Sequence, residues 1–317
     1  VQLRDPDNAC SLIKRHMGTA YPQEFRGQEY TPETISALIL KEIVKTANSE
    51  LGEEVSKAVI TVPAYFGIQE KEATKQAGQI AGLDVVGIVT EPVAAALSLG
   101  IRGVQPETIL VYDLGGGTFD TTIMRAEAGR VEVIAIDGNK SLGGADWDEA
   151  LAQLIADKFV AQAGLGGENP RLDSEFEIEL LGQAEDTKKA LTKRENATVR
   201  CRFEDKDEQI AVTRAEFEAA TKHLVTQTLE ISKRVVTAAE AKVPGLKVDR
   251  VLLVGGSSKM PMIDAALRGQ LGWDPANTNF DLAVAKGAAI YGQAAVDEVL
   301  STDRTEVPVA ADAEEKY

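Results

Sequence analysis

Hydrophobic residues in the first hundred positions alternate between helical and strand spacing. After Thr31, apolar residues recur three and four positions apart, and Pro32 stands where the first turn of a helix tolerates it. Short β-branched runs in the same region are typical of buried strands. The elements expected here are helices at 31–52, 69–81 and 91–99 and strands at 57–62 and 85–89. This order predicts strand–helix–strand units.

The pattern then changes to three strands in succession. Apolar runs at 108–112, 119–124 and 131–136 are joined by short turns, which predicts an antiparallel meander. Because the meander follows strand–helix–strand units, we expect an α/β fold whose sheet is mixed, with parallel and antiparallel neighbours.

Helical spacing dominates the remainder of the chain. The expected elements are helices within 143–183 and at 185–191, 214–242, 262–271 and 282–296, a hairpin at 198–203 and 209–212, and a buried strand at 251–254. We interpret the block of about 143–220 as an insertion before the final strand–turn–helix unit, which predicts two lobes with a cleft between them. The segment 301–317 is acidic and rich in small residues, so it is expected to be a disordered tail.

Composition narrows the set of partners. The 317 residues carry a net charge of −16, which argues against nucleic-acid and membrane partners, because both require a basic surface. A phosphate-bearing small molecule remains compatible, since backbone N–H groups and Mg²⁺ hold phosphates with little Lys or Arg. The two cysteines and two histidines show no metal-ligand or disulfide spacing, so a reducing cytoplasm is the expected location.

The strongest local signal is the sequence DLGGGTFD at 113–120. Three successive glycines between two strands allow the backbone to approach an anion closely. The carboxylates of Asp113 and Asp120 flank these glycines and suit a hydrated Mg²⁺ ion, which takes few carboxylate ligands. Thr118 adds a hydroxyl donor for a terminal phosphate. The alternative is an ordinary hairpin in which the glycines only satisfy a turn.

A second glycine turn follows the buried strand at 251–254. Gly255, Gly256 and Ser257 lie between that strand and a helix, and such a junction seats an anion at the helix N-terminus. Turns of this composition also occur for packing reasons alone. The two glycine turns together point to a nucleotide site more strongly than either does by itself.

One face of the helix near residue 190 carries polar side chains. Glu185, Lys188, Lys189 and Thr192 stand at positions i, i+3, i+4 and i+7, so they share that face. Hydrogen bonds from this face, with a cation over a ring, would hold a ribose and an adenine. An ordinary solvated helix face has the same composition.

Lys14 and Glu91 carry no local sign of function. Lys14 has the surroundings of a surface or ion-paired lysine, and Glu91 those of an acidic residue in the first turn of a helix. Evidence for any further role of either residue has to come from outside its local sequence.

Five motifs resemble, in order and separation, the ATPase domain of the heat-shock seventy chaperones of the DnaK type. They are ITVPAYF at 60–66, EPVAAAL at 91–97, DLGGGTFD at 113–120, LGGADWD at 142–148 and LLVGGSSKMP at 252–261. The resemblance covers about 8–294. It implies an actin-like (ribonuclease H-like) two-lobed ATPase fold, with 1–102 as the remainder of lobe I and 103–300 as lobe II.

The resemblance also assigns roles to individual residues. It implies catalytic roles for Lys14, Glu91, Asp113, Thr118 and Asp120, with Asp113 and Asp120 at the Mg²⁺ ion. It implies nucleotide contacts for Gly115, Gly116, Gly117, Glu185, Lys188, Lys189, Thr192, Gly255, Gly256, Ser257, Lys259 and Asp281. Lys189 and Lys259 stand where members of the family often have arginine, which stacks on adenine differently from lysine.

The family resemblance implies an activity and partners as well. We expect slow, Mg²⁺-dependent hydrolysis of ATP to ADP, coupled to the binding of unfolded polypeptides, with a J-domain co-chaperone and a nucleotide exchange factor. The family's opening strands and first phosphate loop are missing from this sequence and are expected upstream of Val1. The family's interdomain linker and peptide-binding domain are likewise absent after Leu300. A nucleotide-binding scaffold without useful hydrolysis is the alternative; a sugar or acetate kinase or a filament protein on this fold is disfavoured by the five motifs.

Overall fold

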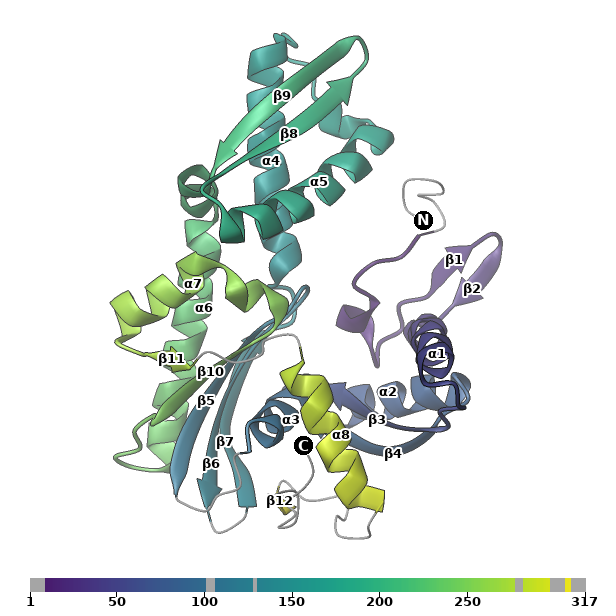
Figure 1. Ribbon diagram of the computed structural model, residues 1–317, viewed down its shortest axis with the longest axis vertical. Helices are drawn as coiled ribbons and strands as arrows, with labels where there is room; N and C mark the ends of the chain where they lie inside the picture. The colour runs from purple at the N-terminus through teal and green to yellow at the C-terminus, as the bar shows by residue number, and fades with distance from the viewer. Residues whose placement is uncertain (1–8, 101–105, 128–129, 277–281, 297–305, 309–317) are drawn as a thin grey trace.

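The computed structural model describes residues 9–100, 106–127, 130–276, 282–296 and 306–308, which form a mixed α/β protein (Figure 1). The helices are α1 (Pro32–Leu51), α2 (Ile68–Ile80), α3 (Glu91–Ser98), α4 (Gly144–Ala163), α5 (Ser174–Lys193), α6 (Arg214–Lys242), α7 (Pro261–Ala266) and α8 (Ala283–Val296). Short helical turns are η2 (Ile13–His16), η3 (Pro170–Leu172), η4 (Gly256–Lys259) and the π-helical η5 (Leu267–Leu271). None of these helices has the length and apolarity needed to cross a bilayer.

A six-stranded mixed sheet forms the largest layer. Its strands, in spatial order, are β11 (Pro275–Ala276), β10 (Arg250–Val254), β5 (Glu107–Leu114), β6 (Phe119–Glu127), β7 (Arg130–Asn139) and β12 (Glu306–Pro308). The antiparallel meander β5–β6–β7 and the mixed character of the sheet confirm the prediction. The parallel pairs in this sheet, however, involve strands from late in the chain, because β10 pairs in parallel with β5 and with β11.

The strand–helix–strand unit near the N-terminus has a sheet of its own, contrary to the expectation that it would join the mixed sheet. Strands β3 (Lys57–Val62) and β4 (Asp84–Thr90) pair in parallel and are connected through α2. Helices α3 and α8 lie between this pair and the six-stranded sheet (Figure 1). The apolar runs predicted each of these strands correctly. They did not specify which strands pair, because the pairing depends on the position in space to which α3 carries the chain after β4.

A second difference concerns part of the segment 301–317, for which disorder was expected. Residues 301–305 and 309–317 lie outside the described residues, but Glu306–Pro308 form β12, which pairs antiparallel with β7. The physical reason lies in β7, whose outer backbone N–H and C=O groups would otherwise form an open sheet edge. The acidic composition of the segment therefore does not predict its pairing at these three residues.

The long helices pack against one another and against the meander to form the main core. Trp147 and Phe159 of α4 and Phe217 of α6 are fully buried in it. Thr213 and Glu216 form a reciprocal capping box at the start of α6. The hairpin of β8 (Asn196–Phe203) and β9 (Lys206–Thr213) extends this region, and the small hairpin of β1 (Gln23–Phe25) and β2 (Gln28–Tyr30) lies near α1 (Figure 1).

Helices α3 and α8 pack at backbone distance. A Cβ placed on Gly287 of α8 would overlap the carbonyl group of Ala94 in α3, and Ala94 is itself fully buried. The alanine-rich sequence of α3 is therefore a requirement of close packing, since any larger side chain would push the two helices apart. This contact holds the β3–β4 pair close to the main sheet.

Replacing Gly287 by alanine should therefore destabilise the protein. Overpacking a close helix contact costs about 1–3 kcal/mol in the free energy of unfolding. Chemical denaturation followed by circular dichroism measures this change.

Gly182→Ala is the matched control, because Gly182 lies inside α5 and a Cβ there would meet no atom within 4 Å. Alanine at that position should stabilise by up to about 1 kcal/mol through helix propensity. Equal stability changes at both positions would contradict the close packing of α3 on α8.

Candidate functional site

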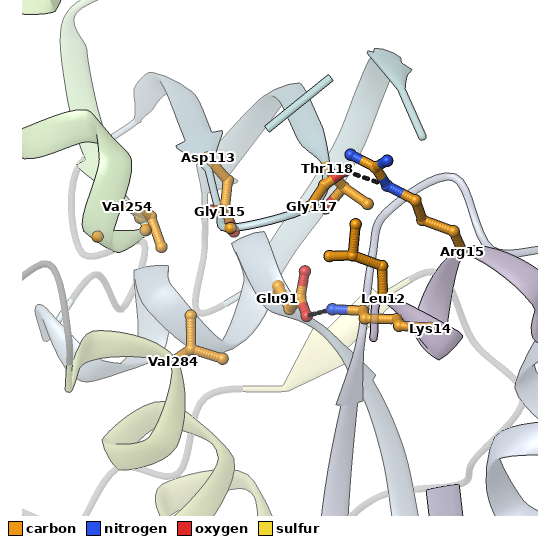
Figure 2. Close-up of a pocket in the computed structure, with 13 residues that line it drawn as sticks. Leu12, Lys14, Arg15, Glu91, Asp113, Gly115, Gly117, Thr118, Val254 and Val284 are labelled. Carbon is orange, nitrogen blue, oxygen red and sulfur yellow. Dashed lines mark hydrogen bonds and ion pairs between the residues drawn. The ribbon is translucent and has the colours of Figure 1, made fainter. Parts of the chain in front are cut away.

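A cavity of about 400 Å³ opens where five distant segments of the chain meet (Figure 2). Its walls come from the N-terminal segment around η2, the start of α3, the β5–β6 turn, the end of β10 and the start of α8. The lining residues are Leu12, Lys14, Arg15, Glu91, Asp113, Gly115, Gly116, Gly117, Thr118, Val254, Gly255, Gly256 and Val284. Most of the residues predicted from sequence to be catalytic are thus brought to one place.

In the glycine turn at 115–117, the carbonyl groups of Gly115 and Gly116 are bonded to the start of α4. Gly144 N–H donates to Gly115 O at 2.9 Å, and Ala145 N–H donates to Gly116 O at 2.8 Å. The first amides of α4 are satisfied in this way. Within the part of the chain that the structure describes, the N–H groups of Gly116 and Gly117 have no hydrogen-bond acceptor. They are consequently available to an anion.

Gly143 and Gly144 make this arrangement possible, and sequence reasoning assigned them no role. A Cβ on Gly143 would overlap the backbone of Gly117 and Thr118, and a Cβ on Gly144 would overlap Ser257 Oγ. At Gly116 a Cβ would meet nothing within 4 Å and would project into open space. The signal that could have found them is the LGGADWD motif, because adjacent glycines before a helix indicate close backbone packing.

Asp113 and Asp120 are directly opposite one another in the β5–β6 ladder, and both are buried. Burial and the negative charge of Glu91 raise the pKa of Asp113 from 3.8 to about 7. Burial, with the charges of Asp113 and Glu91, raises the pKa of Asp120 to about 8. Lys14 opposes both shifts.

When they are ionised, the two carboxylates concentrate negative charge that a cation would neutralise. Neither carboxylate oxygen of Asp120 has a hydrogen-bond partner among the described residues. Buried carboxylates without donors are costly, and hard oxygen ligands suit Mg²⁺. Asp120 does not itself line the cavity, whereas Asp113 does. The residues present therefore fit a Mg²⁺ ion that Asp113 would hold, with Asp120 as the neighbouring carboxylate.

Lys14 and Glu91 form an ion pair across the cavity. The distance from Lys14 Nζ to Glu91 Oε1 is 2.5 Å, although 77 positions separate them in sequence (Figure 2). Lys14 comes from η2, and Glu91 is the first residue of α3. Neither had a local signal, and the fold places the two against each other at the mouth of the site.

Two neighbours of Lys14 were not predicted to take part. Arg15 Nε donates to Gly117 O at 2.8 Å, and Arg15 Nη2 lies 3.3 Å from Asp146 Oδ2. Leu12 has a left-handed backbone with φ of 55°, which is unusual for a leucine. Figure 2 shows both side chains reaching toward the glycine turn. Residues 12–15 thus form one wall of the cavity.

The second glycine turn packs directly behind the first. Gly255 has φ of 83°, and a Cβ there would overlap Leu114 O and lie 2.7 Å from Asp113 Oδ1. Ser258 Oγ donates to Val254 O at 2.6 Å and accepts a hydrogen bond from Leu114 N–H at 3.4 Å. Only glycine fits at 255, so its presence has both a conformational and a packing cause.

A second cavity of about 590 Å³ adjoins the first and shares Leu12, Gly116 and Gly256 with it. Its other lining residues are Ala145, Asp148, Glu185, Lys188, Lys189, Thr192, Lys193, Ser257, Lys259 and Met260. All the nucleotide contacts implied by the family resemblance line one of the two cavities, except Asp281, which lies outside the described residues.

The polar residues of α5 differ in their surroundings. Lys188 is buried, and its Nζ donates to Gly144 O at 2.9 Å and to Asp148 Oδ2 at 2.8 Å. Lys189 is 62% exposed and pairs with Glu185 at 2.8 Å, which lowers the pKa of Glu185. Thr192 Oγ1 donates to Lys188 O at 3.0 Å. Lys188 is therefore a buried part of the cavity wall, whereas Lys189 lines the cavity with an exposed side chain.

Comparison with known proteins gives a consistent result. A family model described as "Hsp70 protein" matches residues 2–308. Two proteins named "Chaperone protein DnaK", from two strains of Halobacterium salinarum, are each 40% identical to the chain over 314 residues. The match covers 96% of this chain and 49% of each relative, so the chain spans about half the length of the curated relatives it matches.

The raised pKa values of Asp113 and Asp120 predict how stability depends on pH in metal-free buffer. Between about pH 4 and pH 8 the folded chain holds more protons on these carboxyls than the unfolded chain does. Their contribution to the free energy of unfolding is therefore complete below about pH 4 and is lost as the pH rises through about 7 to 8.

Thermal unfolding in the presence of a chelator, at several pH values across this window, tests the expectation. Asp120→Asn should flatten the fall in stability toward pH 8, because it removes the carboxyl whose pKa is raised most. Asp205→Asn, at a side chain 81% exposed, is the control and should leave the slope unchanged. A slope that is the same in all three proteins would refute the assignment.

Proposed function

The chain belongs to the Hsp70 family, and on that premise we propose that it is the nucleotide-binding part of a molecular chaperone that binds and slowly hydrolyses ATP. One observation carries the proposal. The amides of Gly116 and Gly117, the buried Asp113 with Asp120 paired to it across the ladder, and the ion pair of Lys14 with Glu91 come together at a single cavity, which Asp113 lines and Asp120 does not. A second cavity continues from it through Gly116 and Gly256.

The shape of the two cavities supports an extended ligand with a charged end. The polyphosphate would lie in the cavity of about 400 Å³, where the amides of Gly116 and Gly117 donate to it. The ribose and the base would lie in the cavity of about 590 Å³ against α5 and η4. Glycine at the shared boundary keeps the passage between the two open.

Mg²⁺ would neutralise phosphate charge when bound, and Asp113 with Asp120 behind it would hold it through its waters. The chain's own residues would do the rest. Thr118 would donate to a terminal phosphate oxygen, and Lys14 would offset the negative charge that develops during transfer. Glu91, held by Lys14 at 2.5 Å, would orient the attacking water. Catalysis of this kind consists of positioning and charge neutralisation.

The wider assignments follow from the family and extend the proposal. We propose an actin-like two-lobed arrangement, with 1–102 in lobe I and 103–300 in lobe II, joined here through the packing of α3 on α8. Hydrolysis would change the angle between the lobes, and a polypeptide-binding domain of the whole protein would respond to it. Unfolded polypeptides, a J-domain co-chaperone, a nucleotide exchange factor and a cytoplasmic location belong to the same proposal.

Lys14→Ala should abolish ATP hydrolysis and leave ATP binding nearly intact. The lysine contributes charge at the reacting phosphate, and losing one such group costs about 10²–10³ in rate. Single-turnover hydrolysis measures the rate, and calorimetry measures the affinity. Lys45→Ala removes a lysine of the exposed pair Lys45–Glu42 and is the control. Unchanged turnover in Lys14→Ala would refute the role of this lysine.

ATP affinity should depend on Mg²⁺. Chelation leaves Asp113, with Asp120 paired to it across the ladder, facing the polyphosphate without a cation, so ATP affinity should fall by at least about tenfold. Calorimetric titrations with Mg²⁺ and with a chelator test this expectation. Binding without measurable turnover would instead support a nucleotide-dependent scaffold. If neither condition gives binding, the nucleotide site itself is wrong.

A further inference from the structure

Leu12 has a backbone conformation that no turn requires. Its φ of 55° lies in the left-handed region, which is uncommon for a leucine. The other described residues with positive φ, glycines aside, are Arg26 and Glu204. Each of these two directly follows a strand and lies in the two-residue turn of a hairpin, where a positive φ is common. Leu12 lies in no hairpin, so its conformation needs a different explanation.

The side chain of Leu12 lies at the boundary between the two cavities. Three residues line both cavities, and the other two are Gly116 and Gly256. Among the lining residues that the structure describes, Leu12 therefore carries the only side chain at this boundary. Its Cδ2 atom lies 3.0 Å from the position that a Cβ on Gly117 would take, and Figure 2 shows it between the glycine turn and Lys14. An extended ligand that occupies both cavities has to pass this side chain.

The backbone is held on the C-terminal side of Leu12 and exposed on its N-terminal side. Arg15 N–H donates to Leu12 O at 2.9 Å, and Arg15 Nε donates to Gly117 O at 2.8 Å. Cys10 and Ser11, which come directly before Leu12, are both exposed. A change of Leu12 from the left-handed to the extended region alters both φ and ψ. The leucine side chain would thereby turn off Gly117, and neither of the two preceding residues would leave a buried position.

We propose that Leu12 is a gate: in the left-handed state its side chain narrows the passage between the two cavities, which the glycines alone would leave open. In the extended state the side chain leaves the passage. Because leucine favours the extended region over the left-handed one, this open state is accessible. The inference rests on the proposed function, since that function requires a ligand that spans both cavities. The affinity for such a ligand is reduced in proportion to the fraction of molecules whose gate is open.

Leu12→Gly in the full chain is the test, because glycine keeps the left-handed backbone available and removes the side chain. Calorimetric titration with ATP and Mg²⁺ should give an affinity about tenfold higher than that of the unaltered chain, as for a gate open in about a tenth of the molecules. Leu12→Phe enlarges the side chain at the same point and should lower the affinity. Leu172→Ala is the matched control, because Leu172 is 84% exposed and lines neither cavity; its affinity should be unchanged.

Tripolyphosphate distinguishes a gate from a general effect on the phosphate wall, because it has no ribose or base to place in the second cavity. Competition with a fluorescent ATP analogue, in the presence of Mg²⁺, measures its affinity. In Leu12→Gly this affinity should change by less than about twofold, since a ligand confined to the first cavity does not cross the boundary. Circular dichroism checks the fold of each variant, and Leu12 is 39% exposed, so its replacement costs little stability.

Each outcome bears on the gate. A higher affinity for ATP but not for tripolyphosphate in Leu12→Gly supports it. An ATP affinity in Leu12→Gly no higher than that of the unaltered chain, or an equal gain for tripolyphosphate, would overturn the gate and leave the ATP site standing. If ATP binds neither the unaltered chain nor Leu12→Gly, the proposed function fails, and the gate fails with it.

Discussion

The geometry of the site depends on one backbone contact, the seating of the α4 N-terminus on the carbonyls of the glycine turn. Gly144 and Ala145 donate to Gly115 and Gly116, and this fixes which side of each peptide faces the cavity. A peptide whose carbonyl is held on one side presents its N–H groups on the other, so the same bonds that cap α4 create a concave surface of donors. Gly143 is required because any Cβ there would separate the two elements.

That contact also explains why carboxylates are tolerated in the interior. Asp113 and Asp120 stand near the end of β5 and the start of β6, on opposite sides of the turn, so they share its rigidity and cannot move apart when both are charged. Burial and the charge of Glu91 raise the pKa of both carboxyls, and the charge of Asp113 further raises that of Asp120. Two buried acids beside the amides of Gly116 and Gly117 are the arrangement expected of the proposed site, in which a cation and an anion bind together.

Sequence predicted the elements of this fold well and their arrangement less well. Periodicity and β-branched runs located α1, α6 and the β5–β7 meander, because these depend on local preferences and on one buried face. The separate β3–β4 sheet and the pairing of β12 with β7 were missed, since neighbours in a sheet are chosen by contacts far apart in the chain. For the site, the glycines and acids of 113–120 could be recognised from the local sequence. Arg15, Leu12 and Gly143 could not, because their importance appears only once η2 and α4 meet the turn.

The two cavities differ in the groups that line them. This difference affects how each cavity would recognise its part of a ligand. The first includes backbone groups of the glycine turns and Asp113, which is buried in the sheet, so this part of its chemistry depends on the fold. The second is bordered by long side chains at the end of α5 and in η4, where Lys189 and Lys193 are exposed. Substitution at such positions costs little stability. In the proposed nucleotide site, phosphate recognition is therefore coupled to folding itself, whereas the wall proposed for the base can be substituted at little cost in stability.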